Sequence, residues 1–272
     1  MILANASPAI APLAVAAVLA YLTPAVTSAR MSIRFSQMAL LAAWCLHGLL
    51  LILGFISAQP RFGFGPALSV TAWLALTVYA VESRLLPQMQ ARWTLACLGG
   101  ATVVLAWLFP GAPLHVNLSP WLPVHWVLGI ASYGLFAAAV VHAWLMNRAE
   151  KQIRSAHLEV GAPSGIPLMT LERLMFRFVE VGFVLLTGTL LVGVLFGEQL
   201  YGAGVGKGWK WDHKTVFSVL SWVAFAVLLV GRSYFGWRGR KATRVLYVGA
   251  TLLLLAYAGS RFVMEVLLGR VP

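Results

Sequence analysis

The sequence predicts an all-α, polytopic membrane protein with about eight transmembrane helices. Of its 272 residues, 60% are hydrophobic and only 10% are charged, and the mean hydropathy is +0.84. A chain of this composition has too few polar side chains to cover the surface of a soluble globule. Apolar stretches of at least about 17 residues follow one another along it, and each is long enough to cross the ~30 Å hydrocarbon core as a helix.

The elements follow in order from these stretches. The first has no basic residue before it, so we interpret it as a retained span and not as a cleaved signal peptide. The outward loop before the fifth span contains four prolines, and a glycine-rich loop, residues 198–214, precedes the seventh. No internal repeat interrupts the chain, so we treat 1–272 as a single membrane domain. The predicted spans lie near residues 8–26, 35–57, 66–83, 93–109, 125–146, 178–197, 215–231 and 245–260.

The longest hydrophilic segment, residues 147–174, separates the first five spans from the last three. Its first half, 147–159, is charged, and two glycines and two prolines alternate between 161 and 167. Glycine and proline at this density break a helix. We therefore predict that 147–174 is a cytoplasmic connector.

Lysines and arginines predict the orientation, because cytoplasmic loops retain positive charge during insertion. One set of loops holds fourteen of the twenty cations and the other set only six. Both termini and the 198–214 loop are therefore predicted to face the periplasm of a bacterial-type inner membrane. The net charge of +12 then reflects topology and contact with anionic lipid, and we predict no nucleic-acid partner.

The two cysteines, Cys45 and Cys97, lie inside predicted spans and form no C-x-x-C pair. This pattern argues against thiol exchange and against a covalent C-x-x-C-H attachment site. The sequence also contains no nucleophile elbow, phosphate loop or zinc-ligand pair, and its eight carboxylates are scattered. We therefore predict that the protein is not an enzyme.

Two histidines stand out for their position in the spans. His47 lies in the middle of the second span, where a neutral imidazole either binds a metal centre or hydrogen-bonds a neighbouring helix. His125 starts the fifth span, with Gly129 and Tyr133 beneath it at four-residue spacing. That spacing leaves a surface for a flat group, although histidines at helix starts also serve as caps or interface residues.

The 198–214 loop carries the most unusual chemistry of the chain. Trp209 and Trp211 flank Lys210, and Asp212 follows them. An indole offers a large flat face with an N–H at its edge. This chemistry suits either a flat amphipathic ligand or the membrane interface.

The run Gly-Trp-Lys-Trp-Asp-His-Lys-Thr at 208–215, followed by Trp222 and by Gly-Trp-Arg-Gly at 236–239, resembles the tryptophan-rich WWD signature of the cytochrome c assembly family. That family includes the CcsA/ResC- and CcmC-type haem-handling proteins. The resemblance covers about 125–260, the assembly-like core. In size and number of spans the chain is most similar to the smaller HemX- and YpjD-like branch.

The resemblance implies a non-covalent haem site on the outer face. In the family the tryptophan-rich segment is a haem platform, and histidines of flanking loops are axial ligands. By position, Trp209, Trp211 and Asp212 match the platform and His125 matches an iron ligand, while His47 is a weaker match to the family's membrane histidine. No histidine follows His213, so His213 or His115 would have to supply a second ligand. The nearby cations, which suit haem propionates, are Lys207, Lys210 and Lys214.

Three functions compete on this sequence. The resemblance implies a haem-binding, haem-handling membrane protein that supports cytochrome c biogenesis, with cytochrome c assembly proteins or an apocytochrome as partners besides the lipid bilayer. The alternative is a haem-free membrane scaffold or regulator of a partner enzyme or transporter, which the missing histidine favours. A third is a solute transporter that uses His47, Arg177 and Glu180 as buried polar groups.

Overall fold

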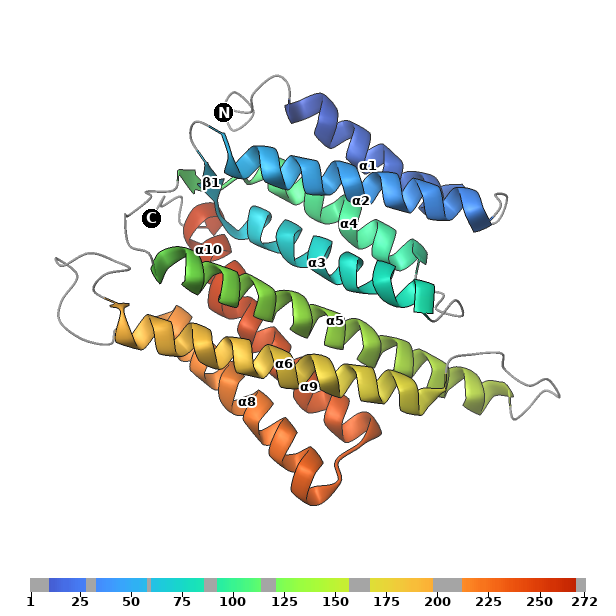
Figure 1. The fold of residues 1–272 in the computed structure, drawn as a ribbon, viewed down its shortest axis with the longest axis vertical. Coiled ribbons are helices and arrows are strands. Elements are labelled where there is room, and N and C mark those ends of the chain that lie inside the picture. The colour runs from blue at the N-terminus through green and yellow to red at the C-terminus, as the bar shows by residue number, and fades with distance from the viewer. Residues whose placement is uncertain are drawn as a thin grey trace. The chain divides into compact units, whose positions relative to one another are not determined.

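The computed structural model of the chain is helical in nearly all of the residues it describes, which are 10–27, 33–57, 60–85, 92–113, 121–156, 167–197 and 212–267. Within these residues eight long helices follow one another, which confirms the predicted all-α, polytopic fold (Figure 1). Their bounds are α1 (Ile10–Thr27), α2 (Ile33–Phe55), α3 (Phe64–Leu85), α4 (Arg92–Leu108), α5 (Trp121–Ala156), α6 (Leu168–Leu195), α8 (His213–Phe235) and α9 (Gly239–Leu254).

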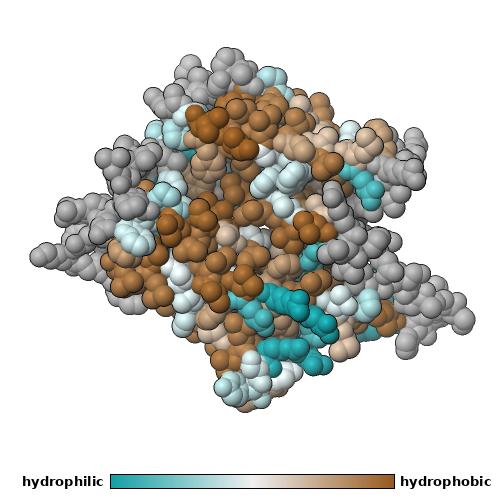
Figure 2. Space-filling view, in the orientation of Figure 1, coloured by the Kyte–Doolittle hydropathy of each residue, from teal (hydrophilic) through white to brown (hydrophobic). Residues whose placement is uncertain are grey.

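Six helices of the described part are long and apolar enough to cross a membrane, namely α2, α3, α5, α6, α8 and the helical run that begins with α9. The apolar stretches of α1 and α4 are shorter, Ile10–Thr23 and Thr94–Leu108. Fifteen residues of helix span only about 22 Å, less than the ~30 Å hydrocarbon core. Figure 2 shows the expected result, since hydrophobic side chains make up much of the visible surface.

The helices group into two compact units, each described by itself. Unit 1 consists of Met1–Leu85, Met89–His115 and Arg261–Pro272, and unit 2 of Leu86–Gln88 and Val116–Ser260. Unit 2 contains the segment 125–260 that carries the family resemblance.

In unit 1, α1 packs against α2 and α4, and α3 packs against α4. A short antiparallel ladder ties the end of α4 to the start of α3, with β1 (Arg61–Phe62) paired to β2 (Ala112–Pro113). Gly111 makes this possible because it has a φ of 80° and its Cα faces the backbone of Gly63, where an added Cβ would lie 2.5 Å from the amide nitrogen.

In unit 2, α5 and α6 form the most extensive helix pair, α8 and α9 form a second pair, and α9 also packs on α5. Phe136 of α5 stacks on Phe225 of α8 with 3.7 Å between ring centroids. Gly182 of α6 lies against Phe136, and Gly249 of α9 lies against Phe225, where an added Cβ would approach the ring to 2.8 Å. Small residues thus let helix backbones close onto a buried aromatic pair, as membrane helix packing requires.

The helices that flank the connector are longer than the hydropathy predicts. α5 continues ten residues past the predicted end at 146, and α6 begins ten residues before the predicted start at 178. The extension of α5 is polar and carries a Glu150–Arg154 pair at i,i+4, while Arg240 lies 3.6 Å from Glu150. Helix geometry persists in water when such pairs support it, so the loss of hydropathy at 147 marks the edge of the apolar stretch and not the end of the helix.

The last helix changes its hydrogen-bond pattern and also outlasts the predicted end at 260. α9 passes into a π-helix, η2 (Leu255–Gly259), then α10 (Ser260–Phe262) and a second π-helix, η3 (Val263–Leu267). A change from i−4 to i−5 pairing leaves a carbonyl to be satisfied from outside the helix. The Tyr133 hydroxyl of α5 donates to the Leu253 carbonyl beside this change.

Candidate functional site

His125 lies five residues into α5 and faces α6. Its Nδ1 is 3.1 Å from the Thr189 carbonyl oxygen, and the side chain is half-buried. A carbonyl oxygen only accepts, so Nδ1 carries the proton and donates it. In the neutral ring Nε2 therefore holds the free lone pair. This is the arrangement in which metal-ligating histidines are usually held, with one ring N–H on a backbone carbonyl and the other nitrogen turned to the metal.

Two features fix the imidazole in this position. Gly193, one turn after Thr189, lies against the ring, and an added Cβ there would be 3.5 Å from His125 Cε1. Trp121, four residues before His125, stacks on Phe196, the C-cap residue of α6, with 3.9 Å between centroids and 7° between planes. The start of α5 and the end of α6 are thus held together on both sides of the histidine.

Sequence analysis did not predict three residues that hold His125 in place, which are Trp121, Thr189 and Phe196. The i,i+4 spacing of Trp121 and His125 puts both on one helix face and is a signal that sequence alone offers. Thr189 and Phe196 carry no such signal, because their pairing with α5 depends on the register of two helices 64 residues apart in the chain.

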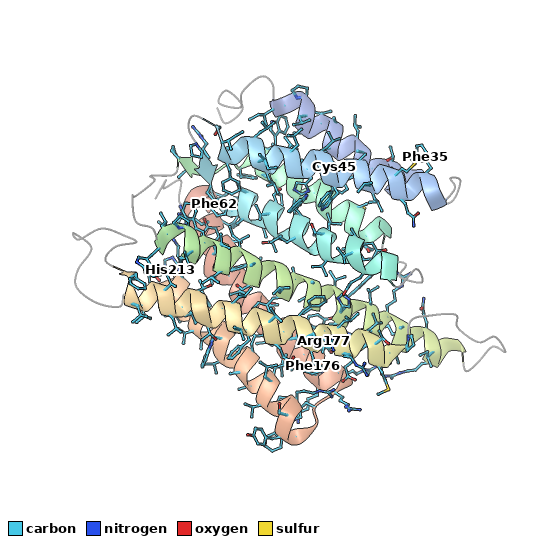
Figure 3. The ribbon with its side chains drawn as sticks, viewed as in Figure 1. Phe35, Cys45, Phe62, Phe176, Arg177 and His213 are labelled. Atoms are coloured by element: carbon cyan, nitrogen blue, oxygen red, sulfur yellow. The ribbon has the colours of Figure 1, made fainter. Side chains whose placement is uncertain are left out.

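α8 begins at the end of unit 2 where His125 lies. Figure 3 labels His213 at the same end of the view as the start of α5 and the end of α6. Asp212 is the N-cap of α8, and its Oδ1 accepts a hydrogen bond of 2.8 Å from the Thr215 amide. His213 and Asp212 are exposed, and Lys214 Nζ lies 5.9 Å from the centroid of the Tyr257 ring. We call this part of the molecule, with His125, the His125 end of unit 2.

The other tryptophans of the signature have packing partners. The Trp222 indole of α8 donates a 2.8 Å hydrogen bond to the Thr187 hydroxyl of α6 and stacks on Phe183. Trp237, between α8 and α9, lies over Gly231. Trp209, Lys210 and Trp211 lie outside the described residues, as do Lys207 and His115.

His47 belongs to unit 1 and is fully buried. Its Nδ1 is 3.1 Å from the Tyr21 hydroxyl, and its Nε2 is 2.7 Å from the Ser69 hydroxyl. Both ring nitrogens are therefore occupied by neighbouring helices, α1 and α3. This geometry corresponds to the packing interpretation of His47, and ligation would require one of the two hydrogen bonds to open.

The polar residues of the transporter hypothesis are not all buried. Arg177 and Glu180 lie on the exposed face of α6, unlike His47. The prediction that these three form a set of buried polar groups is therefore wrong for Arg177 and Glu180.

A model of the family described as cytochrome C assembly protein matches residues 33–268. The chain belongs to the cytochrome c assembly family. The match runs from α2 to the end of the last helix, so it reaches further toward the N-terminus than the 125–260 core on which the resemblance was seen.

Curated relatives of the chain support the same family assignment. The inner membrane protein YpjD of Escherichia coli is 33% identical over 153 residues, 56% of this chain and 56% of the relative. The cytochrome c biogenesis protein CcsA of Prochlorococcus marinus is 26% identical over 187 residues, 67% of this chain and 54% of the relative. An uncharacterised 28.8 kDa protein of Azospirillum brasilense is 30% identical over 242 residues, 84% of this chain and 82% of the relative.

The chain spans about half the length of the YpjD and CcsA relatives it matches. No solved structure matches it.

Proposed function

We propose that the protein binds haem non-covalently at the His125 end of unit 2 and supports cytochrome c biogenesis by presenting it at the outer face of a bacterial-type inner membrane. The observation that carries the proposal is the hydrogen bond from His125 Nδ1 to the Thr189 carbonyl, which leaves Nε2 for an iron. Bound haem would supply an iron that a neutral imidazole can ligate and two anionic propionates. One relative, YpjD, is named an inner membrane protein, and another, CcsA, is named a cytochrome c biogenesis protein. Both names agree with the proposed location and role.

The residues around His125 fit a flat, anionic, largely apolar group. Trp121 and Phe196 form a rigid aromatic wall beside the imidazole. Lys214 lies at the start of α8 at the same end, where its ammonium group suits a propionate. Asp212 caps α8 and so fixes where the preceding loop joins the helix.

The remaining members of the site come from the predicted loop and are part of the proposal. Trp209, Trp211 and Asp212 would form the platform on which haem lies, and Lys210 would join Lys214 as a propionate partner. His213 would be a second ligand of the haem iron, since it follows the platform directly in the sequence and is exposed. His47 would take part only through a second haem position inside the membrane.

A haem-free scaffold remains the second candidate. It is favoured by one sequence observation, that no histidine follows His213. In either case we expect partner proteins, namely cytochrome c assembly proteins or an apocytochrome, because the matching family is described as cytochrome C assembly protein.

Visible spectroscopy of the full chain, purified in detergent with and without added haem, tests the proposal. We expect a Soret band that His125→Ala abolishes or shifts and that free imidazole restores, because exogenous imidazole occupies the position left by the side chain. Trp211→Ala is expected to weaken haem retention at least tenfold, on the scale of one or two lost aromatic contacts.

Trp144→Ala is the matched control for Trp211→Ala, because Trp144 is an exposed tryptophan toward the other end of α5. It is expected to retain haem as the parent protein does. Absence of a Soret band after haem supplementation, or an unchanged band in both His125→Ala and Trp211→Ala, contradicts the proposal and favours the scaffold.

A further inference from the structure

An apolar groove runs along one face of α8, away from the His125 end of unit 2. Its volume is about 240 Å³, and it is lined only by apolar residues, among them Trp222, Val223, Val227, Val230, Phe235 and Trp237. Val223, Val227 and Val230 follow one another at helical spacing and are exposed. No histidine, cysteine, aspartate or glutamate lines the groove, so its walls suit hydrocarbon and not a metal group.

Trp237 forms the end of this groove and is held rigidly. Its backbone N–H donates a 3.0 Å hydrogen bond to the Gly231 carbonyl. Its ring lies so close to Gly231 that an added Cβ would be 2.3 Å from the ring atom Cε3. Lys241 Nζ lies 4.2 Å from the ring centroid. Trp237 therefore contacts both the apolar groove and a cation, as tryptophans at the boundary between hydrocarbon and headgroups do.

The turn between α8 and α9 carries more positive charge than its neighbours neutralise. Arg232 is paired with Glu172 at 3.7 Å and Arg240 with Glu150 at 3.6 Å. Three further cations at this turn are exposed and have no carboxylate within ion-pair distance in the described part of the chain. They are Arg238, Lys241 and Arg244. Figure 2 shows hydrophilic side chains gathered near this turn, next to hydrophobic surface.

Backbone N–H groups at the start of α9 also favour an anion at this turn. α9 begins at Gly239, and its N-cap, Arg238, places no side-chain hydrogen bond on the first turn. The N–H groups of that turn are therefore left for an outside acceptor, and the helix dipole favours an anion there. The anion that fits must also carry an apolar chain, because the groove opens beside the same turn.

The groove is long enough for a lipid chain. From Trp222 to Phe235 it follows fourteen residues of α8, and this run of helix rises about 20 Å. A lipid chain in one leaflet spans about half of the ~30 Å hydrocarbon core. An acyl chain thus fits along the three valines while its headgroup lies at Trp237.

We propose that the α8 groove and the exposed cations of the α8–α9 turn form a binding site for one anionic phospholipid. The acyl chain lies against Val223, Val227 and Val230, and the phosphate lies between Lys241 and Arg238 at the start of α9. The site is separate from the proposed haem site and does not depend on it.

Native mass spectrometry of the full chain, released from vesicles of phosphatidylcholine with a minor share of phosphatidylglycerol, tests this site. We expect the protein to retain one phosphatidylglycerol in strong preference to phosphatidylcholine. Arg238→Gln with Lys241→Gln is expected to reduce that preference by roughly tenfold or more, since each cation near a headgroup contributes severalfold to binding. The matched control, Arg173→Gln with Arg177→Gln, removes two exposed cations from α6 and is expected to keep it.

Filling the groove tests the apolar half of the site. Val227→Phe is expected to lower phosphatidylglycerol retention, whereas Val184→Phe, at an exposed valine of α6, is expected to leave it unchanged. Equal helicity and thermal midpoint in all variants show that they fold. The proposal is overturned by a charge variant that keeps the preference, by a control pair that loses it equally, or by parent protein that retains both lipids alike as an unselective annulus.

Discussion

His47 and His125 are both imidazoles in apolar surroundings, yet their hydrogen bonds differ in kind. His47 has a hydroxyl on each ring nitrogen, from Tyr21 and Ser69, and all three side chains are buried. His125 has one backbone carbonyl on Nδ1. A histidine with both nitrogens bonded inside a helix bundle stabilises packing, whereas one with a fixed Nδ1–H presents Nε2 to a ligand.

His47→Leu is therefore expected to lower the stability of the protein and leave its visible spectrum unchanged. The variant leaves the Tyr21 and Ser69 hydroxyls without their shared partner in an apolar interior, at a cost of about 1–3 kcal/mol in the free energy of unfolding. His47→Gln, which keeps a donor and an acceptor, is expected to lose less. Unfolding in detergent measures both, and loss of the Soret band in His47→Leu would show instead that this residue ligates haem.

At the scale of elements, hydropathy predicted where the long helices lie in the chain but not where they end. The apolar stretches end near 146 and begin again near 178, yet α5 and α6 extend ten residues further on each side. The extension of α5 is stabilised by two ion pairs, Glu150–Arg154 and Glu150–Arg240. The second of these joins helices far apart in sequence, so it could not be predicted from the spacing within one segment.

The candidate site also has features that local sequence predicts and features that it does not. The position of His125 at a helix start and the cluster of Asp212, His213 and Lys214 at the start of α8 follow from local sequence. The carbonyl of Thr189 does not, because it is contributed by the register between α5 and α6. Main-chain partners have no residue-type signature, so sequence patterns alone do not reveal them.

The start of α8 gives a prediction at this scale, because Asp212 has a structural role beside the proposed platform role. Its carboxylate caps the helix through Thr215. Asp212→Ala removes the cap and is expected to cost about 1 kcal/mol of stability, whereas Asp212→Asn keeps an acceptor and is expected to cost little. Thermal unfolding in detergent measures the two costs.

Haem titration of the same two variants separates the roles. If Asp212 acts only through α8, Asp212→Asn binds haem as the parent protein does and Asp212→Ala binds it more weakly. Equal weakening in both variants would show that the negative charge itself belongs to the platform.

At the scale of the whole chain, charge divides the two ends of unit 2. Lys214 is the one cation of the described residues at the His125 end. The opposite end carries ten, which are Arg148, Lys151, Arg154, Arg173, Arg177, Arg232, Arg238, Arg240, Lys241 and Arg244. The ion pairs from Arg232 to Glu172 and from Arg240 to Glu150 join these elements at one end. This distribution supports the proposed orientation, with the basic end in the cytoplasm and the His125 end outside.

Cysteine labelling along α6 tests that orientation, because its 28 residues rise about 42 Å and exceed the ~30 Å hydrocarbon core. In a background with the two exposed cysteines, Cys45 and Cys97, replaced by alanine, Gly197→Cys and Met169→Cys place one thiol near each end of the helix. Gly197 has open space for a side chain, and Met169 is exposed. A membrane-impermeant maleimide added to intact spheroplasts is expected to label Gly197→Cys at once and Met169→Cys only after lysis. The reverse labelling pattern would place the His125 end in the cytoplasm. Haem presented on that side could not reach an apocytochrome outside, so this result would contradict the proposed role.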